Sequence, residues 1–172
     1  MSGFVRRLSA IPWRHIAGEA LSRAFLVAQA FCAVHFVDHH VCSLAFVRGP
    51  SMLPAMNLAG DVVAVDRVSV QLGRVSRGDV VLLISPEDPR KAVAKRVLGM
   101  EGDAVTYLVD PGSCDASKTV VVPQGHVWVQ GDNIYDSRDS RQFGAVPYGL
   151  ITGKIFCRVW PLEGFGSIDS QE

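Results

Sequence analysis

The chain has 172 residues, which is enough for one domain with a hydrophobic core. Its 17 Lys and Arg residues balance 17 Asp and Glu residues, and no basic run or basic helix face is present. This balance excludes the electrostatic surface expected of a nucleic-acid-binding protein.

The first 20 residues form a basic leader. Arg6, Arg7 and Arg14 all precede the first acidic residue, Glu19. A short basic segment ahead of an apolar stretch is typical of targeting or of membrane orientation rather than of a folded core. Residues 1–20 are therefore expected to direct the chain rather than to build its fold.

Residues 21–47 predict an anchor helix. The 24 residues between Arg23 and Arg48 contain no Lys or Arg. As a helix they would be about 36 Å long, against roughly 30 Å for the hydrocarbon core of a membrane. Polar residues interrupt the run, so an amphipathic helix on a membrane or against a partner stays open as an alternative. A cleaved secretory signal is disfavoured because no small-residue cleavage site precedes Gly49.

The same segment contains histidines and cysteines that need no metal. His35 and His39 flank Asp38, but on a semi-polar helix a partner contact explains them better than a metal site. No Cys-x-x-Cys pair occurs, so neither zinc binding nor thioredoxin-like chemistry is predicted. A disulfide between Cys114 and Cys157 stays open, although their spacing does not support it.

After Pro54, short β-type runs separated by Gly and Pro replace the helical pattern and predict a β-rich domain over residues 48–163. The predicted strands are residues 61–65, 80–84, 92–98, 104–109, 119–122, 127–129 and 155–160. Their number and turn-rich spacing predict a mainly β fold, in which the N-terminal membrane-anchoring helix precedes a curled antiparallel sheet. The polar residues 164–172 are expected to form a loose tail.

Ser51 is the candidate nucleophile, in the sequence Gly49-Pro50-Ser51-Met52-Leu53-Pro54. A serine hydroxyl reacts only when a base takes its proton and the backbone fixes its direction. Gly49 allows close approach of a substrate, and Pro50 fixes φ and removes an N–H donor. Ser51 would then project from a stiff bend, with its own N–H available to an oxyanion. Met52 indicates a turn held at a site, because exposed linkers seldom carry Met-Leu.

Lys95 is the candidate general base. Alternation in the predicted strand places Val93, Lys95 and Val97 on one face. An ammonium desolvated among valines becomes less stable than the neutral amine, so the pKa falls towards the range useful to a base. The alternative is a lysine whose stem packs on a half-buried strand while its amine stays in water.

A histidine base has little support. Four of the five histidines precede Val41, and the fifth, His126, lies where a strand begins. A Ser-His-Asp triad is therefore disfavoured.

Residues 137–141 are candidates for supporting the base. Asp139 and Arg141 are two positions apart and can form an ion pair on one side of an extended chain. The hydroxyl of Ser137 could orient the neutral amine of Lys95, which is the third-group role in a nucleophile–base arrangement.

Three sequence blocks together resemble the type I signal peptidases. Within that family they are most similar to the mitochondrial inner membrane protease branch, in particular its plant-type subunit 1. The blocks are residues 49–54, 95–103 and 122–153, and the resemblance extends over residues 49–161. Each block alone is a weak signal, whereas all three in this order are specific.

The resemblance implies a Ser-Lys dyad in which Ser51 is the nucleophile and Lys95 the general base. It also implies that Ser137 supports the lysine and that Asp139 and Arg141 shape the site. The endoplasmic-reticulum branch carries His at the Lys95 position and is disfavoured. Many bacterial relatives have a serine, an oxyanion donor, where this chain has Gly49, so a second donor must come from elsewhere.

The implied function is a membrane-bound serine endopeptidase that removes sorting or presequence peptides through an acyl-enzyme. It would face the mitochondrial intermembrane space from the inner membrane, work with a related second protease subunit, and need no cofactor or metal. Its partners would be presequence-bearing substrates and the lipid bilayer, with no nucleic acid. Alternatives are a bacterial- or plastid-type signal peptidase I, a catalytically silent assembly subunit, or a self-cleaving regulator of the repressor type. The regulator would need a DNA-binding module, which residues 1–48 do not resemble.

Overall fold

The structure is a computed structural model that describes residues 13–110 and 114–168. The chain divides into an N-terminal unit, Met1–His39, and a C-terminal unit, His40–Glu172.

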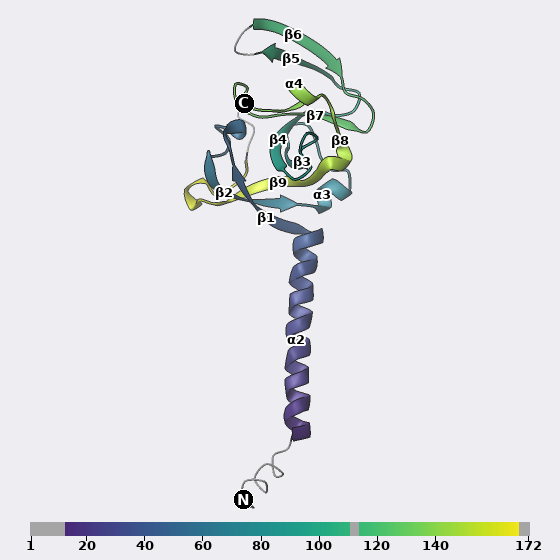
Figure 1. The fold of residues 1–172 in the computed structure, drawn as a ribbon, viewed down its shortest axis with the longest axis vertical. Helices are drawn as coiled ribbons and strands as arrows, with labels where there is room; N and C mark the ends of the chain where they lie inside the picture. The colour runs from purple at the N-terminus through teal and green to yellow at the C-terminus, as the bar shows by residue number, and fades with distance from the viewer. Residues whose placement is uncertain (1–12, 111–113, 169–172) are drawn as a thin grey trace, which may run out of the picture. The chain divides into compact units, whose positions relative to one another are not determined.

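The described part of the N-terminal unit is one helix, α2 (Trp13–His40), drawn in purple to blue in Figure 1. Over Arg14–His40 it is long and apolar enough to cross a membrane, by length and composition alone. Large side chains are exposed along it, including Phe25 at 65% and Phe31 at 72%. Exposed aromatic side chains on a long helix are unfavourable in water, and lipid would accommodate them.

The helix differs at both ends from the predicted anchor, residues 21–47. It begins at Trp13, inside the predicted leader, and it ends at His40. Residues Cys42–Arg48 form strand β1 instead. Their exposure alternates, with Ser43 buried and Phe46 81% exposed, as a strand with one covered face requires. An apolar run of this length suits either structure, and pairing with a second strand decides between them.

The C-terminal unit contains two antiparallel sheets, which confirms the predicted mainly β fold. The larger sheet has seven strands in the order β1-β2-β9-β3-β4-β7-β8, and β5 and β6 form a separate hairpin. The strands after β1 are β2 (Ala59–Asp66), β3 (Val80–Ile84), β4 (Ala92–Gly99), β5 (Ala104–Asp110), β6 (Cys114–Val121), β7 (His126–Gln130), β8 (Val146–Pro147) and β9 (Ile151–Trp160). Every predicted strand overlaps one of these, while β1 and β8 were not predicted.

Short helices lie between the strands and after the last of them, β9. They are η1 (Pro50–Met52), α3 (Val68–Gln71), α4 (Ser140–Phe143), η2 (Tyr148–Leu150) and η3 (Leu162–Gly164). Of these, η1 and α4 carry residues of the candidate site.

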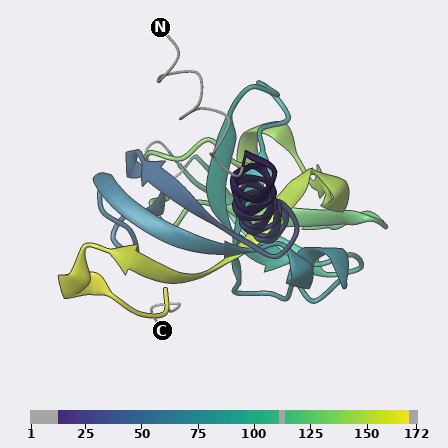
Figure 2. The same cartoon turned by 90° about the horizontal axis from the view of Figure 1, so that it is seen from below.

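Irregular pairing curls the larger sheet. The register shifts twice between β2 and β9, between Val62 and Val63 and between Ala64 and Val65. Such bulges bend a strand and increase its twist. Seen from below, the yellow β9 follows the curved blue strand β2 (Figure 2). The β5–β6 hairpin lies at the opposite end of this unit from β1 (Figure 1).

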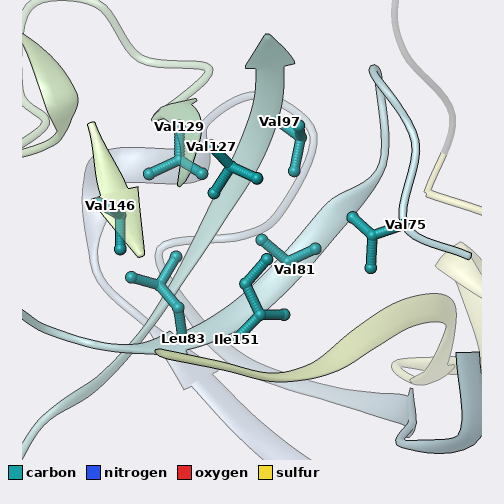
Figure 3. Close-up of a cluster of buried hydrophobic side chains, with 8 residues drawn as sticks. All are labelled: Val75, Val81, Leu83, Val97, Val127, Val129, Val146 and Ile151. Carbon is teal, nitrogen blue, oxygen red and sulfur yellow. The ribbon is translucent and has the colours of Figure 1, made fainter. Parts of the chain in front are cut away.

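Two clusters of buried side chains form most of the core. The first brings together valines, one leucine and one isoleucine, mainly from β3, β4, β7, β8 and β9 (Figure 3). The second includes Met52, Met56, Val63, Val65 and Ala94. Full burial of a side chain of this size stabilises the fold by about 1.5–3 kcal/mol. Met52 is 1% exposed, so its burial in the second cluster anchors the segment around Ser51 to the core.

The predicted loose tail, residues 164–172, is ordered further than expected. Gly166 pairs with Arg158 in an antiparallel bridge, with N···O distances of 2.8 and 3.2 Å. Ile168 then packs against the second core cluster. The apolar side chain of Ile168 and the bridge at Gly166 explain this return, which a reading based on polarity missed. Residues 169–172 lie outside the described part of the chain.

Candidate active site

The segment containing Ser51 is a tight turn held at both ends. Gly49 has φ of 116°, a conformation that favours glycine, and its N–H donates to Leu58 O at 2.8 Å. Ser51 then lies in the single turn of η1, where Leu53 N–H donates to Pro50 O at 3.2 Å. With Met52 buried beneath it, Ser51 is partly exposed at the surface of the turn.

Lys95 lies in β4, opposite Val81 of β3, and is 2% exposed. Its Nζ donates to Ser137 Oγ at 3.1 Å. Burial lowers the pKa of Lys95; the Asp139 carboxylate opposes this shift, and the Arg141 guanidinium adds to it. The alternative of an amine in water is therefore wrong, and the neutral amine is favoured relative to an exposed lysine.

Asp139 connects the groups behind Lys95. It is fully buried, and its Oδ2 accepts from Ser137 Oγ at 2.7 Å and from Gly131 N at 3.0 Å. Arg141 forms a bidentate ion pair with it, at 2.9 Å to Oδ1 and 2.8 Å to Oδ2. Burial raises the pKa of Asp139, but the hydrogen bonds from Arg141, Gly131 and Ser137 outweigh burial and lower the pKa overall. This carboxylate is thus ionised and fixes Ser137.

The predicted pairing of Asp139 with Arg141 is present, although not on an extended chain. Asp139 is the N-cap of α4, and it accepts from the backbone N–H of Arg141 at 3.2 Å. Gln142 completes a capping box by accepting from Asp139 N at 2.8 Å. The start of this short helix therefore sets the position of the carboxylate.

Sequence reasoning did not assign a role to Gly131, Asp132 and Asn133, which follow β7. Gly131 packs so closely that a Cβ there would overlap both Ser51 O and Ser137 Oγ. Asp132 forms a bidentate ion pair with Arg96, at 2.8 and 2.7 Å. Asn133 contacts the carbonyls of Pro50 and Ser51. The only available signals were the small glycine and the adjacent Asp-Asn pair, both of which also occur in ordinary turns.

Gly131 and Ser137 connect the Ser51 turn to Lys95. Within the described ranges, no hydrogen bond joins Ser51 Oγ to Lys95 Nζ, and the amine donates to Ser137 Oγ. Gly131 touches the Ser51 backbone and the Ser137 side chain at once. Hydrogen bonds between catalytic groups are often long without substrate and shorten when it binds.

A pocket opens beside Ser51. Its walls are Phe46–Arg48 at the end of β1, Met52, Leu82 of β3 and Ala92–Ala94 of β4. β1 is an edge strand of the larger sheet, and β4 pairs with β7 only from Arg96 onwards. The pocket therefore lies between two strand segments that have unpaired edges in the described sheet. Such edges can accept an extended peptide as an added strand.

The remaining candidates lie elsewhere. His126 begins β7, where its Nδ1 is 2.8 Å from Gln124 O. In the described part of the chain, no group of three or more His, Cys, Asp or Glu residues could hold a metal ion. His35 stacks on Phe31 and on His39 within α2, with ring centroids 6.4 and 6.0 Å apart. Cys157 is a free thiol, which rules out the disulfide left open above.

Residues 20–112 and 109–160 match the family described as signal peptidase, peptidase S26. The mitochondrial ATP-independent inner membrane protease subunit 1a of Arabidopsis thaliana is 52% identical over 91% of this chain and 93% of its own. Human mitochondrial inner membrane protease subunit 1 is 38% identical over 89% of this chain and 90% of its own. Subunit 2 from Schizosaccharomyces pombe is 41% identical over 79% of this chain and 74% of its own.

A solved signal peptidase I from Enterococcus faecalis also aligns with this chain. It matches 46% of this chain and 95% of its own, with a TM-score of 0.41 and 26% identity. The family match and the full-length relatives do not depend on that partial overlap. The chain therefore belongs to the signal peptidase family, peptidase S26, and is a serine endopeptidase of that family.

Proposed function

We propose that this chain removes sorting or presequence peptides from proteins delivered to the mitochondrial intermembrane space, with Ser51 as nucleophile and Lys95 as general base. The observation that carries the proposal is the 2% exposure of Lys95, whose amine is held by Ser137. Gly131 packs against both Ser137 Oγ and the Ser51 carbonyl, which brings the lysine site and the Ser51 turn together. A buried lysine with a lowered pKa, and with no ion-pair partner among the residues that the structure describes, is costly to keep for structure alone.

In the proposed reaction, the neutral Lys95 amine takes the proton of the Ser51 hydroxyl as Oγ attacks the scissile carbonyl carbon. The Ser51 N–H donates to the oxyanion that forms. Protonated Lys95 then gives its proton to the leaving amine, and the peptide bond breaks to leave an acyl-enzyme. Water attacks this ester with Lys95 again as base, and the serine hydroxyl is regenerated.

The roles of the supporting residues follow from their contacts. Ser137 accepts a hydrogen bond from Lys95 Nζ and donates one to Asp139, so the amine has a fixed direction in either protonation state. Arg141 keeps Asp139 ionised. Its positive charge also disfavours protonated Lys95, which helps the lysine to act as a base.

The substrate would bind as an extended strand between the end of β1 and the start of β4. Pocket residues such as Leu82 and Val93 are apolar, which suits a small or otherwise pocket-fitting side chain next to the cleaved bond. Backbone hydrogen bonds to the free strand edges would supply affinity, and the pocket would supply selectivity.

The relatives named above support the proposed place of action. Those relatives are inner membrane protease subunits of mitochondria, and α2 could cross that membrane. We place the C-terminal unit in the intermembrane space and propose a heteromer with a related second subunit. The similarity of this chain to both subunit 1 and subunit 2 relatives supports such a pairing of related chains.

Serine-to-alanine substitution in the full chain tests the proposal. Ser51→Ala is expected to abolish cleavage of a radiolabelled intermembrane-space precursor by isolated mitochondria, while retaining partner co-purification. Ser76→Ala, at an exposed serine, is the matched control and should process normally. Processing by the Ser51→Ala chain would refute the nucleophile assignment. Unchanged processing by Lys95→Met would refute the base assignment.

Normal processing by the Ser51→Ala chain, together with loss of processing in organelles that lack the chain altogether, would point to a silent assembly subunit. Localisation is tested separately, by protease protection of a tagged full-length chain. A C-terminal tag that is digested only after the outer membrane is opened supports the proposed orientation. A tag digested in intact organelles would contradict it.

A further inference from the structure

We propose that Asn133 is a positioning residue that directs the Ser51 backbone N–H towards the oxyanion. The inference rests on the proposed function, because it concerns the same nucleophile turn. Asn133 follows β7 and is distant in sequence from that turn, yet it contacts two successive peptide units there.

Both donors of Asn133 that face the turn are used. Its side-chain Nδ2 donates to Pro50 O at 3.1 Å, and its backbone N–H donates to Ser51 O at 3.1 Å. Pro50 O also accepts from Leu53 N at 3.2 Å, so one carbonyl is held both from within η1 and from outside. Asn133 therefore fixes the carbonyls on both sides of the Ser51 Cα.

Because the peptide unit is planar, holding the Pro50 carbonyl also sets the direction of the Ser51 N–H. In a trans peptide the C=O and the N–H lie in one plane and point in opposite directions. Holding Pro50 O towards Asn133 consequently points the Ser51 N–H away from it. Holding Ser51 O limits rotation of the next peptide unit as well. An oxyanion donor contributes most when its direction is set before the reaction begins.

Asn133 is itself tied to the strand that carries the base. The preceding residue, Asp132, forms the bidentate ion pair with Arg96, which also donates to Gly78 O at 2.9 Å. Arg96 is the neighbour of Lys95 in β4. The base strand is thus linked to the nucleophile turn by the ion pair of Arg96 with Asp132, the chain from Asp132 to Asn133, and the hydrogen bonds of Asn133. These links fix the position of the turn relative to the strand.

Asparagine suits this position because the position requires a donor and an acceptor on the same side chain. While Nδ2 holds Pro50 O, Oδ1 accepts from Tyr135 N at 3.2 Å. Aspartate keeps the shape, the backbone N–H and the acceptor for Tyr135. It would place a carboxylate oxygen against Pro50 O, so Asn133→Asp removes the contact that the proposal depends on.

The test is steady-state kinetics of the full chain, co-purified with its partner in detergent. The probe is a peptide spanning the site at which the wild-type chain cleaves a precursor. We expect Asn133→Asp to lower kcat about 10- to 100-fold, somewhat less than loss of an oxyanion donor itself. KM should stay within about twofold, because ground-state binding is not affected. The added carboxylate should raise the pKa of Lys95, as the neighbouring Asp132 does, so kcat is compared on the pH plateau above the acidic limb.

Asn57→Asp is the matched control. Asn57 is exposed and donates through Nδ2 to Asp61 at 2.8 Å, so the same substitution costs a hydrogen bond and adds a charge without removing a contact to the Pro50 or Ser51 carbonyl. It should lower the melting temperature with little change in kcat. The proposal is overturned if Asn133→Asp keeps wild-type kcat, raises KM alone, or loses kcat only in proportion to its melting temperature as Asn57→Asp does.

Ser51→Ala separates this inference from the proposed function. If Ser51→Ala cleaves the peptide, the nucleophile assignment fails, and the role of Asn133 fails with it. If Ser51→Ala is inactive while Asn133→Asp is fully active, only the inference about Asn133 fails.

Discussion

Lys95 and Ser137 are joined by a hydrogen bond of 3.1 Å from Nζ to Oγ, between a lysine that is 2% exposed and a serine that in turn donates to Asp139. The amine thus has one direction rather than a choice of rotamers. A long lysine side chain loses much conformational freedom when it is held in this way. The hydroxyl supplies the contact that sets its direction.

Ser137→Ala should therefore impair the reaction more than the fold. We expect kcat about 10- to 100-fold lower with a small change in KM, which is less than loss of the general base itself. Peptide cleavage by the purified full chain measures both constants. Ser140→Ala is the control, since this buried serine accepts from Val129 N at 3.0 Å instead of contacting Lys95. An equal loss of kcat in both variants would contradict the assigned role of Ser137.

The pH dependence of kcat should show one acidic limb set by Lys95. Only the neutral amine can take a proton, so kcat rises as pH increases through the pKa of Lys95. Because burial lowers that pKa, the midpoint should lie below the ordinary lysine value of 10.5. Lys95→Arg stays protonated and should be inactive across the measured range. A midpoint at or above the ordinary lysine value would argue against Lys95 as the base.

Gly131→Ala should disrupt the site because there is no space for a methyl group. The added Cβ would overlap the Ser51 carbonyl in the nucleophile turn and the Ser137 hydroxyl that holds Lys95. We expect loss of at least 10²-fold in kcat/KM together with a lower melting temperature. Gly149→Ala is the matched control, since nothing lies within 4 Å of a Cβ there. Wild-type activity in Gly131→Ala would show that the observed close approach is absent in solution.

Asp139→Asn should destabilise the fold in a pH-dependent manner. It removes the partner of Arg141, whose side chain is 3% exposed, and leaving a buried charge unpaired costs on the order of 3–5 kcal/mol. Urea unfolding followed by circular dichroism measures this loss. Asp136→Asn, at an exposed residue of the same loop, should change little. Similar unfolding midpoints for both variants would contradict the proposed role of the ion pair.

The sign of the pH effect follows from the lowered pKa of Asp139. The folded state holds this carboxylate ionised to lower pH than the unfolded state does, so the ion pair stabilises the fold above the unfolded pKa. That stability is lost as pH falls through the folded pKa. Asp139→Asn has no carboxylate at this position, so its stability should depend less on pH across the acidic range.

The strands that the sequence predicted are those with an unambiguous local signal. Val80–Ile84 and Ala92–Gly99 follow turn residues and are rich in Val, and both are strands. Cys42–Arg48 directly continues an apolar run without a turn signal, so its local pattern predicts a longer helix. Only its long-range pairing with Ala59–Asp66 makes it a strand. Val146–Pro147 is too short to produce a periodic pattern.

The same distinction applies to the site. Ser51 and Lys95 were identifiable because a stiff turn and a charge inside a valine-rich strand are visible locally. The contacts of Asn133 were not identifiable, because its partners are the Pro50 and Ser51 backbone carbonyls, which are far away in sequence. Every residue carries such a carbonyl, and side-chain patterns give no sign of which of them will be contacted.

A single oxygen atom, Oδ2 of Asp139, accepts from Ser137, Gly131 and Arg141, and these residues come from separate positions around the reaction centre. Loss of any one donor lets the carboxylate relax, and the other two contacts weaken with it. Paired substitutions among these residues should consequently lower activity by less than the product of their separate effects. In a mutational survey of the chain, substitutions at Ser137, Gly131 and Arg141 would therefore lower activity as one coupled group rather than as three independent sites.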